Sequence, residues 1–182
     1  MIYFDSRKLA DCLGIGLAKW KRWVREFLPP DPLGGLQSGY ARQFNYKDAF
    51  RVFLGGCLVA ELKFSIPEAK IILSDLNTWL KRTGFFHLQP PNGQETVSDK
   101  VYYRLYIFKT CPNRFSYTIR NVKKVNRLYD ENSNQDCEIY SLDFKNEDID
   151  LLSAEKFETG RVLSIGALYR RFLSGLRQQG TE

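Results

Sequence analysis

The N-terminal third of the chain has apolar residues at the three- to four-residue spacing of helices. This spacing predicts one helix over residues 6–13, which Asp5 or Ser6 can cap, and a second over residues 17–27. Gly14-Ile15-Gly16 separates the two, and glycine tolerates the positive φ that a sharp reversal needs. The pattern therefore indicates two helices joined by a tight turn. The second helix has an apolar face of Trp20, Val24 and Phe27, and Lys19, Lys21, Arg22 and Arg25 occupy its remaining surface.

After the second helix ends, the sequence predicts an extended segment and two more helices. Three prolines within residues 28–32 end the second helix, because proline cannot continue it. Residues 39–44 fit a short extended segment, and an asparagine cap then opens a third helix over 46–62. The sequence Ser-Ile-Pro-Glu at 65–68 is a capping box with proline in the first turn. It predicts a fourth helix over residues 67–82.

The composition changes after residue 83. Tyrosine and β-branched residues become frequent and favour strands, so an antiparallel sheet is expected. The chain is therefore predicted to be α+β, with a mainly helical domain over 1–83, a connector over 84–99, and an antiparallel-sheet domain with a C-terminal helix over 100–182. Strands are predicted over 101–108, 115–122, 125–129 and 137–144 and a helix over 162–176, while the acidic stretch 148–157 fits either a loop or a short helix.

The charge of the chain is unevenly distributed. The formal net charge is +6. Up to Phe64 there are ten Lys or Arg against six Asp or Glu, whereas the remainder has seventeen against fifteen. A basic N-terminal third is compatible with a polyanionic partner such as a nucleic acid. No run of apolar residues is long enough for a transmembrane helix and no signal peptide is apparent, so a cytoplasmic protein is expected.

The residues that usually carry catalysis or metal binding do not form recognisable motifs. The four cysteines make no CxxC pair, and His87 is the single histidine. Paired carboxylates, HExxH, nucleophile elbows and phosphate-binding loops are missing from the sequence. We therefore expect no metal, no cofactor and no enzymatic activity. Cys12 and Cys57 lie in apolar helical patterns and are expected to be buried, reduced thiols.

The order of the N-terminal features resembles the DNA-binding domain of the MerR family. That family has a helix-turn-helix, a leucine-proline stop, a wing with a Gly-Tyr-Arg-x-Tyr pattern, a third helix, and a cap before a fourth helix. The wing here is Gly39-Tyr40-Ala41-Arg42-Gln43-Phe44, with one extra residue before the arginine and phenylalanine in place of the second tyrosine. Asp48 matches the acidic residue of the third helix, while Lys63 departs from the common glycine. The resemblance spans roughly residues 6–76.

The resemblance implies a bacterial transcription regulator with a winged helix-turn-helix. Its second helix would contact bases in the major groove of double-stranded DNA, and its wing would contact phosphates beside the adjacent minor groove. Such regulators bind as homodimers at the nucleoid, usually through a long helix after the fourth. That helix is not evident after Trp79, so the fourth helix, the sheet domain or the 162–176 helix would replace it. The expected DNA-binding residues are Lys19, Lys21, Arg22, Arg25, Tyr40 and Arg42.

Several alternatives stay open at this stage. The chain could be an architectural DNA-binding protein, such as an excisionase-like or plasmid-maintenance factor, instead of a sequence-specific regulator. Trp23 lies near the basic side of its helix and could contact a base or sugar instead of the core. The domain at 100–182 could dimerise, bind a small-molecule effector, or bind a protein partner. Its tyrosines and interleaved Arg104, Arg114, Arg120, Lys123 and Lys124 could form a second nucleic-acid surface or simply a core and dimer interface.

Overall fold

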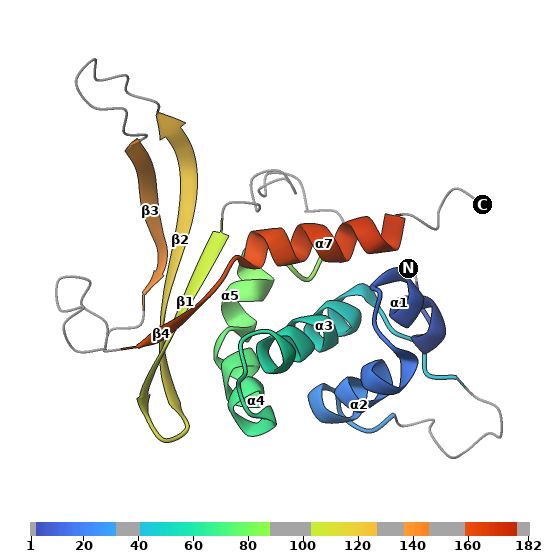
Figure 1. The fold of residues 1–182 in the computed structure, drawn as a ribbon. Coiled ribbons are helices and arrows are strands. Elements are labelled where there is room, and N and C mark those ends of the chain that lie inside the picture. The colour runs from blue at the N-terminus through green and yellow to red at the C-terminus, as the bar shows by residue number, and fades with distance from the viewer. Residues whose placement is uncertain (1–2, 32–40, 88–102, 127–136, 146–158, 178–182) are drawn as a thin grey trace. The chain divides into compact units, whose positions relative to one another are not determined.

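The chain forms two compact units. The computed structural model describes residues 3–31, 41–87, 103–126, 137–145 and 159–177, of which 122–126 and 137–145 are described by their backbone only. Met1–Gln94 and Leu168–Glu182 make up the helical unit, and Glu95–Ala167 make up the sheet unit. The expected mixture of helices, an antiparallel sheet and a C-terminal helix is confirmed (Figure 1). Among the described residues, no helix is long and apolar enough to cross a membrane.

The first two helices have the predicted positions. Helix α1 covers Ser6–Cys12, and the Asp5 carboxylate caps it by accepting a hydrogen bond of 2.8 Å from the Lys8 backbone N–H. Gly14 then adopts a φ of +62°, which turns the chain sharply. Helix α2 covers Leu17–Phe27, as the sequence predicts. The spacing of apolar residues predicts both helices correctly, because each helix buries a single face.

The next two predicted helices are present, but their boundaries differ from the predicted ones. Helix α3 spans Tyr46–Ala60, capped by Asn45, and ends two residues before the predicted position because Lys63 has a φ of +58°. The capping box predicted at Ser65 and Glu68 is present and opens α4 at Ile66–Asp75. The expected single helix over 67–82 is wrong in one respect. A turn at Leu76, with φ −79° and ψ −9°, separates α4 from α5, which covers Asn77–Arg82.

Helix α3 lies at the centre of the helical unit and is fully buried over its middle turns. Two consecutive glycines let α2 approach it closely. A Cβ atom built on Gly56 would lie 2.1 Å from the Trp23 ring, and one on Gly55 would lie 2.7 Å from the Phe27 ring. The glycines therefore provide the space that the large side chains of α2 fill.

Helix α7, Ile165–Arg177, contributes most of its length to the helical unit, where it lies beside α3 (Figure 1). The Phe172 ring is 5.3 Å from that of Phe50, and the Tyr169 hydroxyl donates a 3.0 Å hydrogen bond to the His87 carbonyl. The sequence predicts this whole helix to be part of the domain at 100–182. Residues from Leu168 onward instead belong with the helical unit, because their aromatic side chains complete its core.

The segment after α5 also differs from the simple connector expected over 84–99. Phe85 and Phe86 are buried, and the Phe85 ring lies 6.2 Å from the Phe50 ring in a stacked arrangement. The Gly84 φ of +72° turns the chain so that both rings enter the core of the helical unit. The remainder of this connector and the acidic stretch at 148–157 lie outside the described residues.

The sheet unit contains strands in the order β3-β2-β1-β4, with each neighbouring pair antiparallel. Two expectations are corrected. The predicted strand at 125–129 is not separate, because β2 runs without interruption to Asn126. The edge strand β4, which pairs with β1, was not predicted and overlaps the first two residues of the helix expected over 162–176. The strands are β1 Tyr103–Cys111, β2 Arg114–Asn126, β3 Cys137–Lys145 and β4 Gly160–Leu163.

Candidate nucleic-acid interface

The basic residues of α2 face away from the core. Trp20, Trp23, Val24 and Phe27 are buried on the side toward α3. With about 100° of rotation per residue, Lys21, Arg22 and Arg25 fall together on the opposite side. All three are exposed. The helix therefore presents a continuous basic surface formed by these three residues.

Lys19 is exposed and lies one turn before Arg22, at the edge of that surface next to Trp23. Its ammonium is 5.0 Å from the centroid of the Trp23 ring. This distance is typical of a cation–π contact. The Trp23 ring itself is 7% exposed and packs on Gly56. The idea that Trp23 contacts a base is therefore wrong, because the ring is part of the α2–α3 interface.

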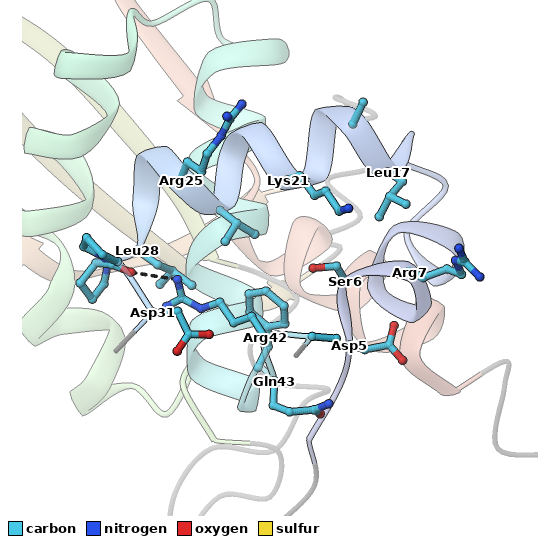
Figure 2. A pocket seen from close by; sticks show the side chains of 16 residues that line it. Asp5, Ser6, Arg7, Leu17, Lys21, Arg25, Leu28, Asp31, Arg42 and Gln43 are labelled. Atoms are coloured by element: carbon cyan, nitrogen blue, oxygen red, sulfur yellow. Dashed lines mark hydrogen bonds between the residues drawn. The ribbon is translucent and has the colours of Figure 1, made fainter. Parts of the chain in front are cut away.

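A groove of about 1150 Å³ lies beside α2 (Figure 2). Lys21 and Arg25 line it from α2, Arg7 from α1, and Arg42 from the extended segment after residue 40. Figure 2 shows the Lys21 side chain directed along the gap between α2 and α1, with Arg25 projecting from the helix. Apolar side chains also line the groove, and Asp5 and Asp31 add carboxylates to its wall. The apolar lining includes Leu17, Val24, Leu28 and Phe44.

Arg42 has a structural role at this groove. Its Nη1 donates a 2.8 Å hydrogen bond to the Pro29 carbonyl, and its guanidinium carbon is 5.6 Å from the centroid of the Phe44 ring. Phe44 in turn exchanges backbone hydrogen bonds of 2.9 and 2.8 Å with Phe4. Arg42 thus fastens the extended segment to the end of α2 and keeps further N–H donors for a ligand. Tyr40, the other predicted wing residue, lies outside the described residues.

The cations of α2 differ from other surface cations of the helical unit. Lys70 pairs with Glu26 at 3.0 Å, and Arg171 pairs with Glu61 at 2.6 Å. Within the described ranges, Lys21, Arg22 and Arg25 take part in no ion pair. A basic surface without internal counterions retains its charge for an external polyanion.

The positions of Arg51 and Arg7 at this interface depend on contacts between separate elements. Arg51 is half-buried, and its Nε donates a 3.3 Å hydrogen bond to the Phe27 carbonyl at the end of α2. Burial lowers the pKa of its guanidinium, and Asp48 partly opposes that shift. The Arg51 side chain therefore caps the C-terminal end of α2. Arg7 joins the groove because α1 and α2 meet there, which helical spacing alone does not specify.

The described side chains contain no cluster of three or more His, Cys, Asp or Glu that could hold a metal ion. Comparison with protein families, with curated proteins and with solved structures finds no match to this chain.

Proposed function

We propose that the helical unit binds double-stranded DNA through α2 and that the chain is a sequence-specific transcription regulator of MerR-like type. The observation that carries the proposal is the surface of Lys21, Arg22 and Arg25, which faces away from the core and has no ion pair among the described residues. An α-helix fits the major groove of DNA, and arginine can bind guanine edges with two hydrogen bonds. The surface therefore has the shape and charge of a recognition helix.

The arrangement around α2 supports a winged helix-turn-helix. Gly14 turns the chain between α1 and α2, and the segment from residue 41 to Phe44 is held beside α2 by the Phe4 bridge and the Arg42 hydrogen bond. This segment would be part of the wing, for which the resemblance implies residues 39–44. The groove beside α2 is lined by basic side chains from three separate elements. Basic side chains of this kind bind the phosphate backbone of DNA.

The α2 surface can be tested by substitution. Arg22→Ala and Arg25→Ala should each weaken binding to a cognate duplex by roughly 1–3 kcal/mol if each contacts a base with two hydrogen bonds. Lys81→Ala is the matched control, because Lys81 is an exposed cation on α5, away from α2. Fluorescence anisotropy gives the dissociation constants, and circular dichroism verifies folding. Unchanged affinity in the folded Arg22→Ala/Arg25→Ala double variant rules out α2 as the recognition helix.

A further inference from the structure

A second hollow lies where the end of α2 meets α3 and α4, and we call it the α2-end pocket. It has a volume of about 420 Å³, within the usual range for sites that bind small ligands. Its lining consists of residues 26–29, Lys47, Asp48, Arg51, Lys70 and Leu73. Leu28 and Pro29 also line the groove beside α2. The pocket and the groove therefore adjoin the same end of the helix.

The charges of the α2-end pocket do not cancel. Its cations are Lys47, Arg51 and Lys70, and its carboxylates are Glu26 and Asp48, which leaves a net charge of +1. Lys70 and Glu26 neutralise each other, because they form the ion pair of 3.0 Å. Neither Lys47 nor Arg51 takes part in an ion pair with any described residue. The surplus positive charge therefore lies on the first two turns of α3.

The half-buried Arg51 guanidinium has only neutral hydrogen-bond partners. Its Nε donates to the Phe27 carbonyl and its Nη1 to the Asn77 side-chain carbonyl, both at 3.3 Å. A guanidinium has five N–H donors, so the other three have no acceptor among the described residues. A partly buried charge without an opposite charge is costly, and burial accordingly lowers the pKa of Arg51, which Asp48 only partly opposes. An anion in the pocket would reduce this cost.

Lys47 is exposed and contributes a second cation to the pocket. Its ammonium lies 5.6 Å from the centroid of the Phe86 ring, a cation–π contact that holds the side chain without neutralising it. Lys47 and Asp48 also belong to the first turn of α3, where the unbonded backbone N–H groups of a helix carry a partial positive charge. The Asp48 carboxylate is therefore partly offset by its own helix.

The position of the pocket fits the binding mode proposed for α2. A helix in the major groove lies between the two phosphate backbones that border the groove. The α2-end pocket is at the C-terminal end of this helix, next to Leu28 and Pro29. A backbone that passes this end can therefore place a phosphate in the pocket. Contacts to phosphates fix the orientation of a recognition helix on the duplex.

We propose that the α2-end pocket binds one phosphate of the DNA backbone through Arg51 and Lys47. This inference rests on the function proposed for α2. The free N–H groups of Arg51 can donate to two phosphate oxygens at once, whereas Lys47 binds as a point charge. The net charge of +1 matches a phosphodiester, which carries one negative charge, better than a phosphate monoester, which carries nearly two.

The test measures how the full-length chain binds a fluorescent duplex of mixed sequence at several salt concentrations. Lys47→Gln/Arg51→Gln should make the slope of log affinity against log salt shallower by about 0.9, the value for one phosphate, and weaken binding roughly three- to tenfold at about 0.1 M salt. Lys81→Gln/Arg170→Gln is the matched control, because it removes one lysine and one arginine from exposed positions of α5 and α7. It should keep the wild-type slope. Unchanged slope and affinity in the pocket variant overturns the proposal.

A second variant keeps the test decisive if the loss of the Arg51 hydrogen bonds loosens α2. Lys47→Glu leaves Arg51 in place and puts a carboxylate at an exposed position of the pocket. It should weaken duplex binding more than Lys81→Glu, which makes the same charge change on α5, and circular dichroism should show unchanged folding for both. Equal losses in these two variants mean that only the total charge matters, and that result overturns the proposal.

A free phosphodiester tests the pocket without the duplex. In ¹H–¹⁵N NMR spectra of the full-length chain, dimethyl phosphate should shift the Nε–H signal of Arg51 in a saturable way, whereas sodium chloride at the same concentration should not. Arg51→Lys lacks this signal and so assigns it. The absence of a saturable shift overturns the phosphate site. A saturable shift without any effect of the pocket variants on duplex binding overturns the DNA backbone as the source of the phosphate.

The outcome is separable from that of the proposed function. If Arg22→Ala/Arg25→Ala weakens duplex binding and the pocket variants do not, only the inference about the pocket fails. If the wild type binds no duplex, the function proposed for α2 fails, and DNA as the source of the phosphate fails with it. The shift of the Arg51 signal then still decides whether the pocket binds a phosphodiester.

Discussion

At the scale of the residue, close contacts in the helical unit determine which side chains each position tolerates. Gly56 has no room for a methyl group, because the Trp23 ring occupies that space. The sequence predicts the apolar face of α2 but not this contact, since helical spacing places Trp23 at the edge of the basic side. Only the partner helix decides that the ring is buried.

Gly56→Ala should therefore lower the free energy of unfolding by roughly 1–3 kcal/mol, the usual range for overpacking a core. Urea unfolding followed by circular dichroism measures this change. Adding Trp23→Leu makes space for the new methyl group, so the double variant should lose less than the sum of the two single changes. Strict additivity would show that the ring and the glycine do not interact.

Cys57 should be unreactive while the protein is folded. Burial raises the pKa of its thiol from 9.0 to about 12, with Glu61 adding to the shift and Arg171, 3.3 Å from the sulfur, opposing it. Because the thiolate is the reactive form, a thiol reagent at pH 8 should label the exposed Cys111 well before Cys57. Mass spectrometry of the digested product locates the label.

The raised pKa of Cys57 also has a consequence for stability. Its contribution is fully present below the unfolded pKa of about 9.0 and is lost as the pH rises towards 12. Cys57→Ala should therefore flatten the decline of unfolding free energy over that range. Labelling of Cys57 as fast as Cys111 in the folded state would contradict its burial.

At the scale of the element, local sequence patterns predict where helices form but not which strands pair or which helices pack together. The bounds of α2 and the capping box of α4 follow from nearby residues, so the sequence specifies them. The joining of two predicted strands into β2 and the pairing of β4 with β1 depend on residues far apart along the chain. Likewise, α7 has a clear amphipathic pattern, but its own sequence does not indicate that it packs against α3.

The docking of α7 on α1 depends on Gly175. A Cβ atom there would lie 2.5 Å from the Cys12 carbonyl oxygen, which is backbone and cannot move aside easily. Gly175→Ala should push the two helices apart and cost about 1–3 kcal/mol of unfolding free energy. Ser174→Ala, at the adjacent exposed position of α7, is the control and should change stability by less than about 0.5 kcal/mol. Similar losses in both variants would argue against the close crossing.

At the scale of the whole molecule, the α2 surface is the site proposed to bind duplex DNA. The basic face of α2 was predictable from sequence, because four cations at helical spacing beside an apolar stripe leave few other arrangements. The groove with Arg7 and the hydrogen bond of Arg42 to Pro29 were not, since they join residues from separate elements. Leu168, Phe172 and Leu173 of α7 are buried in the helical unit, and dimerisation stays a prediction.

The central claim is that α2 binds a specific duplex sequence. The most direct measurement is selection from random duplex DNA by the full-length protein at two salt concentrations, repeated with Arg22→Ala/Arg25→Ala. We expect the wild type to enrich one shared motif, less strongly at higher salt because counterions are released on binding. The double variant should fail to enrich it. Recovery of DNA without any motif, or of the same motif by the double variant, would contradict the account.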